Sequence, residues 1–227
     1  MPAIAANLHA VRQRISAALQ GAARDVTLVA VAKQRGPEEI RAALAAGCRD
    51  IGESYVQEAL PKIAALAGAG IRWHYIGHVQ TNKARDIAAS FDWVHGVDRL
   101  QAAAALDRAR LEGAPLEVCV QVNISSEATK GGVEPAEALS LCRAVAAMPR
   151  LRLRGLMGIA APTDPAARRS QFALLARTFE EVRAAGLAVD TLSMGMSDDF
   201  EAAIVEGSTM VRIGTAIFGE RQRKAAA

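Results

Sequence analysis

Short hydrophobic runs alternate along the chain with longer segments in which apolar residues recur at helical spacing. The short runs are rich in β-branched residues and predict strands over 27–33, 49–53, 72–77, 92–97, 116–124, 151–160, 190–195 and 210–214. The longer segments, rich in Ala and Leu, predict helices over 38–46, 55–68, 82–89, 99–111, 134–147, 165–185 and 198–206. One predicted helix therefore separates each pair of successive strands.

This alternation is typical of parallel strands joined by right-handed crossovers. Eight repeats are the number that closes a (β/α)8 TIM-like barrel, and 227 residues suit that fold. The apolar spacing of Leu8, Val11, Ile15 and Leu19 predicts an additional N-terminal helix. A doubly wound open sheet is the alternative, but no Gly-x-Gly-x-x-Gly follows the first strand. We therefore predict a single α/β barrel domain over residues 1–227.

The composition excludes several classes of protein to which the chain could otherwise belong. Hydrophobic residues make up 51% and charged residues 22%, as in globular proteins, and no apolar run reaches the roughly 20 residues of a membrane span. A net charge of +3 with dispersed basic residues does not indicate nucleic-acid binding. The three cysteines, Cys48, Cys119 and Cys142, form no C-x-x-C pair, which favours a reducing, cytoplasmic setting over a disulfide framework. The acid-free segment 1–24 also suits a transit peptide, although its helical spacing favours a packed helix.

In barrels of this type the chemistry lies at the carboxyl ends of the strands. This rule selects the residues at or just after each predicted strand end: Lys33, Glu53, Ser54, Gly77, His78, Gly96, Asn123, Met157, 194–197 and 212–215.

Lys33 is the first candidate because lysine is rare in this chain, with five Lys against 22 Arg. It follows an apolar run, and partial desolvation at a barrel mouth lowers the pKa of an ammonium group. Such an amine attacks aldehydes and forms Schiff bases. The alternative is a solvated loop lysine, because a polar turn sequence, QRGP, follows it.

The last two strand ends carry a possible phosphate site. Gly214 permits close approach of the backbone, and Thr215 offers a hydroxyl group. Ser197 could bind phosphate too, but its spacing favours the role of N-cap for helix 198–206. Arg212 shares a strand face with Gly214 and needs an acceptor if buried, either a ligand or an acid such as Glu53.

Other motifs are weaker. His74 and His78 lie four residues apart without further ligands, so we expect no metal site. The Gly-rich stretch at Lys130 lacks P-loop spacing, and Lys83 is expected in a solvated loop. The sequence does not indicate a hydrolase triad, since the Gly-x-Ser-x-Gly motif that carries the nucleophilic serine does not occur.

Several motifs in order give the chain a family resemblance. They are VAK at 31–33, GESYVQE at 52–58, WHYIGHVQTNK at 73–83, RGLM at 154–157, and the segments 192–199 and 211–219. Over nearly its whole length the sequence resembles the pyridoxal-5′-phosphate (PLP) homeostasis proteins. Their fold is similar to the barrel domain of alanine racemase without its second domain.

The resemblance implies PLP as the cofactor, held by Lys33 as an internal aldimine. It further implies that Ser197, Gly214 and Thr215 bind the phosphate and that Arg212 faces the pyridine nitrogen. Ser54 is also expected at the cofactor, although the family usually has a longer Asn at this position.

These roles favour a binding protein over an enzyme. Arginine remains charged at ordinary pH, so a ring nitrogen that accepts from Arg212 stays unprotonated and the ring is a poor electron sink. The second base of the racemase relatives, a tyrosine, belongs to the missing domain, and the only tyrosines here are Tyr55 and Tyr75. We expect a monomeric carrier for vitamin B6 homeostasis that supplies apo PLP-dependent enzymes. A weak PLP-dependent racemase and a Schiff-base aldolase are the alternatives.

Overall fold

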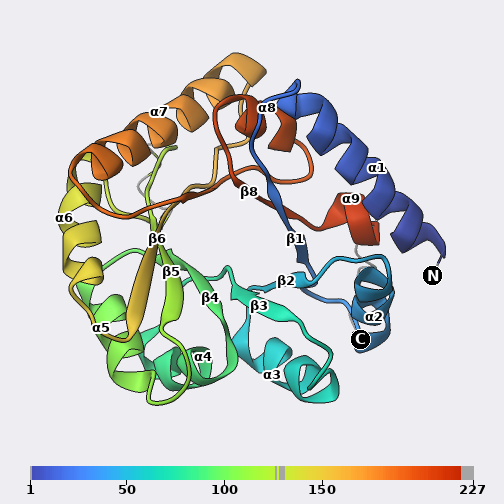
Figure 1. Ribbon diagram of the computed structural model, residues 1–227, viewed down its shortest axis with the longest axis horizontal. Coiled ribbons are helices and arrows are strands. Elements are labelled where there is room, and N and C mark those ends of the chain that lie inside the picture. Colours follow the sequence, from blue (N-terminus) through green and yellow to red (C-terminus); the bar gives the residue numbers. More distant parts are fainter. Residues whose placement is uncertain (1, 126, 128–130, 221–227) are drawn as a thin grey trace.

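Eight parallel strands close into a barrel in chain order, with β8 paired to β1 (Figure 1). The computed structural model describes residues 2–125, 127 and 131–220. The strands are β1 Thr27–Val31, β2 Asp50–Glu53, β3 Arg72–Tyr75, β4 Trp93–Val97, β5 Leu116–Gln121, β6 Leu151–Met157, β7 Thr191–Ser193 and β8 Met210–Ile213. The predicted TIM-like barrel is confirmed, and the open-sheet alternative is wrong.

Helices surround the barrel on its outer face (Figure 1). They are α1 Pro2–Leu19, α2 Pro37–Ala45, α3 Val56–Ala65, α4 Ala84–Ser90, α5 Leu100–Ala109, α6 Pro135–Ala146, α7 Pro165–Ala184, α8 Phe200–Val205 and α9 Thr215–Phe218, with a 3-10 turn η1 at Thr81–Lys83. The sequence pattern does not predict α9, which has a single turn. Among the described residues, no helix combines the length and hydrophobicity that crossing a membrane requires.

Helix α1 is the predicted N-terminal helix. It lies along the outside of the barrel beside α8 and α9 (Figure 1). Leu8, Val11 and Ile15 are buried in the main hydrophobic core, which fills the space between strands and helices. Burial of such side chains contributes about 1.5–3 kcal/mol each, which explains why this segment is part of the fold.

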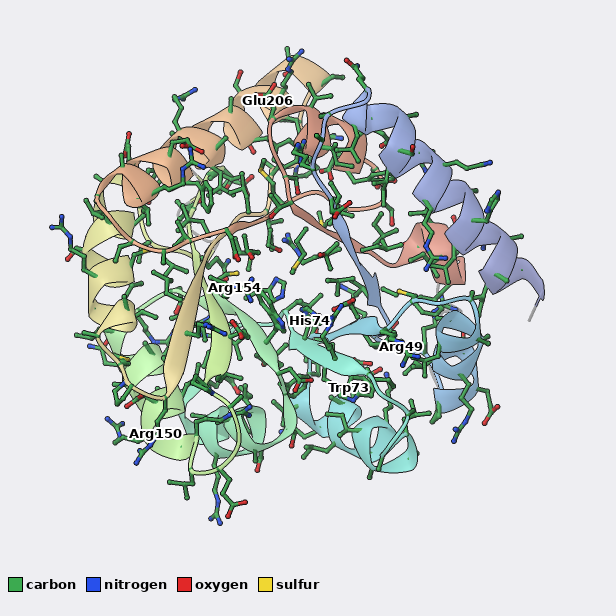
Figure 2. The ribbon with its side chains drawn as sticks, viewed as in Figure 1. Arg49, Trp73, His74, Arg150, Arg154 and Glu206 are labelled. Atoms are coloured by element: carbon green, nitrogen blue, oxygen red, sulfur yellow. The ribbon has the colours of Figure 1, made fainter. Side chains whose placement is uncertain are left out.

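The barrel interior is unusually polar. A small apolar cluster occupies part of it: Val29, Trp93, Cys119, Met157 and Met210. The remaining inward positions include buried polar side chains: His74, His95, Ser193 and Arg212. Figure 2 shows His74 within the ring of strands. Branched apolar residues usually fill these barrels. The polar groups that take their place here are buried away from water and therefore need hydrogen-bond partners within the protein.

Several strands end earlier than the hydrophobic pattern predicts. β1 ends at Val31 rather than at residue 33, and β6 ends at Met157 rather than at residue 160. The next residue of each segment still bonds to the neighbouring strand, Ala32 N to the Gly52 carbonyl and Gly158 N to the Ser193 carbonyl, and the chain then leaves the sheet at the carboxyl-terminal rim. Lys33 therefore lies in a turn, closed by a 3.0 Å hydrogen bond from the Arg35 amide to the Ala32 carbonyl, rather than in the strand.

One close contact between strands gives a stability prediction. Gly155 on β6 has φ +152°, and a Cβ there would lie 1.8 Å from the Thr191 carbonyl oxygen on β7. Gly155→Ala must push the two strands apart, at a cost of about 2–3 kcal/mol in unfolding free energy. Gly186→Ala is the matched control, since Gly186 has φ +85° but open space around it, and about 1 kcal/mol is expected. Urea unfolding measures both, and equal losses would contradict the contact.

Candidate functional site

The carboxyl-terminal rim of the barrel holds a cavity of about 310 Å³. Residues from six separate parts of the chain line it, and they include all six predicted site residues: Lys33, Ser54, Ser197, Arg212, Gly214 and Thr215. The structure thus brings these side chains together as the barrel rule predicts. Their roles in binding stay predictions at this point.

A buried lysine holds the turn that carries Lys33. The Lys62 ammonium group donates to the Ala32 carbonyl at 2.9 Å and to Glu58 Oε1 at 2.6 Å. The same Glu58 oxygen accepts from the Gln34 amide. Backbone groups on both sides of Lys33 are therefore tied to helix α3, which places the Lys33 side chain at the cavity in a defined position.

Glu53 belongs to this buried cluster and does not pair with Arg212. Its side chain is fully buried at the end of β2, and its Oε1 accepts from Lys62 Nζ at 2.7 Å. Burial raises the pKa of Glu53 from an ordinary 4.5 to about 7, although the hydrogen bond from Lys62 acts in the opposite direction. The alternative interpretation of Arg212 as the partner of Glu53 is therefore wrong.

Arg212 is held by neutral acceptors. Its Nη1 donates to Ser193 Oγ at 2.7 Å, and its Nη2 donates to the Gly158 carbonyl at 3.0 Å. Burial lowers the pKa of Arg212 to about 10, which still leaves the guanidinium group charged at neutral pH. The cavity therefore has a fixed, buried cation as part of its lining.

Ser197 is not the N-cap of α8, contrary to the interpretation that its spacing favours. Helix α8 begins at Phe200, and Asp199 occupies the N-cap position, with its Oδ1 accepting from the Met196 amide at 2.6 Å. The Ser197 hydroxyl instead accepts from the Ala216 amide at 3.2 Å. This contact joins the loop after β7 to helix α9, which follows β8, at the cavity.

The loop after β8 brings its backbone close to β1. A Cβ on Gly214 would lie 3.2 Å from the Val31 carbonyl oxygen, so a larger residue would crowd this approach. Thr215 follows with an exposed side chain on the cavity wall. Because the first amides of a helical turn have no partner within it, this segment offers N–H donors together with the hydroxyl groups of Thr215 and Ser197.

Sequence reasoning missed further residues of the cavity wall. Arg35 and Asp198 both line it, so the charged side chains of the lining are the cations Lys33, Arg35 and Arg212 and the anion Asp198. Arg35 pairs with Glu39 outside the lining at 3.2 Å. Lys33 and Arg212 still outnumber Asp198, which favours an anionic ligand. Arg35 could have been suspected, since it lies in the same rim turn as Lys33.

Other positions at the strand ends serve local structure. His78 pairs with Asp98 at 3.0 Å, and the Asn123 amide group donates to the Glu127 carbonyl at 3.1 Å. A Cβ on Gly96 would lie 2.3 Å from the Gly77 carbonyl oxygen, so these two glycines allow close strand contact. Thr129 and Lys130 lie outside the described residues. Within the described part of the chain, no three His, Cys, Asp or Glu residues cluster as a metal site.

Comparison with known proteins places this arrangement in a family. The sequence profile of the alanine racemase N-terminal domain matches residues 3–222, which include all eight strands. Over 225 residues the chain is 52% identical to the pyridoxal phosphate homeostasis protein of Pseudomonas aeruginosa, and 97% of each chain is covered. The chain belongs to the pyridoxal phosphate homeostasis protein family.

Further members of this family agree with the assignment. The pyridoxal phosphate homeostasis protein of Escherichia coli K12 is 49% identical over 226 residues, with 96% of this chain and 97% of that protein covered. The solved structure of PipY from Synechococcus elongatus PCC7942 with PLP bound has a TM-score of 0.83 at 36% identity, and covers 95% of this chain and 100% of PipY. The family resemblance predicted from the motifs is confirmed.

Proposed function

We propose that the chain, as one domain over residues 1–227, is a PLP-binding protein that holds the cofactor covalently on Lys33 and serves PLP homeostasis in the cell. The observation that carries this proposal is the gathering of an amine, a buried guanidinium and paired hydroxyl groups in one cavity of about 310 Å³. A cavity of this size falls at the small end of the range for organic ligands. The names of the relatives support the same cofactor.

The residues present suit the chemistry of PLP. When bound, PLP supplies an aldehyde that condenses reversibly with an amine. Lys33 is the amine in the cavity, and the contacts of Lys62 and Glu58 around its turn hold it there. The hydroxyl groups of Ser197 and Thr215 and the backbone around Gly214, which line the same cavity, would bind the phosphate. Ser54 would lie beside the ring.

Arg212 determines what the bound cofactor can do. It is charged and can only donate, so a ring nitrogen placed against it is an acceptor and carries no proton. A ring without that proton stabilises negative charge on a substrate carbon poorly, which disfavours amino-acid chemistry. Arg212 thereby favours storage of the cofactor over catalysis.

The cavity also has no tyrosine to act as a second base. Tyr55 is 61% exposed, and the Tyr75 hydroxyl donates to the His78 carbonyl at 3.0 Å. Both tyrosines lie within the described residues, and neither lines the cavity. Racemisation needs two positioned proton-transfer groups, one on each face of the substrate carbon. This arrangement favours a carrier that delivers PLP to apo-enzymes over a racemase. We propose that the carrier is monomeric and cytoplasmic, and that it is not an aldolase.

A transfer experiment tests the carrier role. The PLP-loaded protein is mixed with an apo PLP-dependent enzyme, and recovery of that enzyme's activity is followed, with free PLP at the same concentration as reference. We expect the loaded protein to restore activity, and to show no racemase or aldolase turnover of its own above that of free PLP. Efficient turnover that vanishes in Lys33→Ala would contradict the carrier and support an enzyme.

Thr215 gives a sharper test of the phosphate end. Thr215→Ala removes a hydroxyl donor to a charged group, which is worth about 1.5–3 kcal/mol, so the Kd for PLP should rise by about 10- to 150-fold. Binding of pyridoxal, which has no phosphate, should be unchanged, and Thr81→Ala on the exposed turn η1 is the matched control. Equal weakening for PLP and pyridoxal would remove Thr215 from the phosphate site.

A further inference from the structure

A continuous chain of hydrogen bonds crosses the barrel interior from its amino-terminal rim to Arg212. We call its four members the barrel relay: Asp50 on β2, His74 on β3, His95 on β4 and Ser193 on β7. The successive distances are 3.0 Å from Asp50 Oδ1 to His74 Nε2, 3.0 Å from His74 Nδ1 to His95 Nε2, and 2.9 Å from His95 Nδ1 to Ser193 Oγ. Ser193 Oγ then accepts from Arg212 at 2.7 Å.

The end of the relay at Asp50 is an ionised acceptor. Arg72 donates to both carboxylate oxygens of Asp50, each at 2.7 Å. Burial alone would raise the pKa of Asp50, but the hydrogen bonds from His74 and Arg72 outweigh it and lower the pKa to about 2. An ionised carboxylate can only accept, so the proton between Asp50 and His74 belongs to His74 Nε2.

This constraint determines the direction of every later bond. Both imidazoles are buried completely, and burial lowers the pKa of His74 and holds that of His95 well below its ordinary value. A neutral imidazole has one donor and one acceptor nitrogen. His74, which donates from Nε2, must accept at Nδ1 from His95 Nε2. His95 must then accept at Nδ1 from the Ser193 hydroxyl.

The relay therefore determines what Ser193 offers to Arg212. Because the only proton of Ser193 Oγ is committed to His95, the lone pairs of that oxygen remain for Arg212 Nη1. Together with the Gly158 carbonyl, this acceptor holds two of the five N–H groups of the guanidinium on the barrel side. The group is thus oriented before any ligand enters the cavity.

We propose that the barrel relay positions Arg212 as a donor toward the ring nitrogen of PLP, under the control of Asp50 at the opposite end of the barrel. This inference rests on the proposed function for the identity of the ligand. The members of the relay are positioning residues, and they do not line the cavity. The relay would keep the ring nitrogen unprotonated by holding a cation in place against it.

The first test needs no cofactor. Long-range ¹H–¹⁵N NMR of the apo-protein labelled on histidine reports which ring nitrogen carries the proton. We expect both His74 and His95 to be neutral with the proton on Nε2. A charged ring, or a proton on Nδ1 of either residue, would overturn the proposed direction.

Substitution at the far end tests the coupling. In Asp50→Leu, His74 loses its acceptor, and we expect the proton of His95 to move to Nδ1 although His95 does not contact Asp50. Asp50→Asn retains an acceptor oxygen for His74 and should therefore keep the wild-type tautomers. This variant gives a second measurement if Asp50→Leu does not fold. Arg72→Leu is the matched control, since it removes the same ion pair but leaves the Asp50 carboxylate for His74. Unchanged His95 in a folded Asp50→Leu protein would overturn the coupling.

A cofactor readout links the relay to Arg212. PLP labelled with ¹⁵N at the ring nitrogen is bound to the wild type, to Ser193→Ala and to Ser193→Thr. We expect Ser193→Ala to shift the ring-nitrogen signal and to raise the Kd by about fivefold, the equivalent of one hydrogen bond, with recovery in Ser193→Thr. Identical signals in all three would overturn the positioning role. If the wild type itself does not bind PLP, the proposed function fails, while the histidine tautomers still decide the direction of the relay.

Discussion

Lys33→Ala is expected to abolish covalent retention of PLP. The wild-type protein should acquire a visible absorbance band on addition of PLP and keep it through desalting, because the amine in the cavity condenses with the aldehyde. The variant has no amine at that position, so only the phosphate and Arg212 contacts remain. Its PLP should therefore be lost on desalting, as followed by absorbance.

Lys83→Ala is the matched control, since Lys83 lies on turn η1 and does not line the cavity. It should retain PLP as the wild type does. Circular dichroism of Lys33→Ala checks that the barrel is intact. A folded Lys33→Ala protein that still keeps the visible band after desalting would show that another amine holds the cofactor.

Lys62→Met is expected to lower the unfolding free energy by about 3–5 kcal/mol near pH 8. The substitution replaces the ammonium by an apolar group of similar length and leaves the fully buried Glu53 carboxylate without its cation. Breaking a buried ion pair in this way costs more than the pair itself contributes, because Glu53 must then either keep an uncompensated charge or take up a proton at pH 8. Urea unfolding measures the difference.

The loss should depend on pH in a defined direction. Glu53 has a folded pKa of about 7, above its ordinary 4.5, and Lys62 lowers it, so Lys62→Met raises it further. A raised folded pKa gives stability that is complete below pH 4.5 and is lost as pH rises through the folded value. Lys62→Met should therefore be closer to the wild type at pH 5 than at pH 8.

Two further variants serve as controls for the stability loss in Lys62→Met. Arg41→Met breaks an exposed pair with Glu38, whose side chains are 50% and 73% exposed, and should change stability by less than about 1 kcal/mol. The double variant Glu53→Gln with Lys62→Met should recover much of the loss, because no buried charge remains. An equal loss in single and double variants, or a loss independent of pH, would contradict the buried charge as the cause.

The fold could be predicted because the spacing of apolar residues distinguishes the strands from the helices. Strands enclosed on both sides are continuous apolar runs, and the helices between them have an apolar face. The strand ends could not be predicted in the same way. Val122 and Ile124 continue the apolar pattern of β5 and are buried, yet they lie beyond Gln121, where β5 ends, although the Val122 amide still donates to the Met157 carbonyl. Burial alone does not distinguish a strand from a buried rim turn.

The site could be predicted only where position on the barrel decides it. Lys33, Arg212 and Thr215 follow or end strands, and the parallel topology brings such residues to one rim. The role of Ser197 could not be read from spacing, because the Ala216 amide that it binds belongs to helix α9, which follows a different strand. The barrel relay could not be predicted from the sequence either, since His95 and Ser193 lie 98 residues apart.

Borohydride reduction of the PLP-loaded protein, followed by proteolysis and peptide mass mapping, tests the central claim most directly. Reduction makes the bond between cofactor and amine permanent, so the modified lysine can be identified. The geometry of the cavity predicts one reduced pyridoxyl group on the peptide that contains Lys33, and none on the peptides with Lys62 or Lys83. Modification of another lysine in place of Lys33, or no modification at all, would contradict Lys33 as the anchor of PLP.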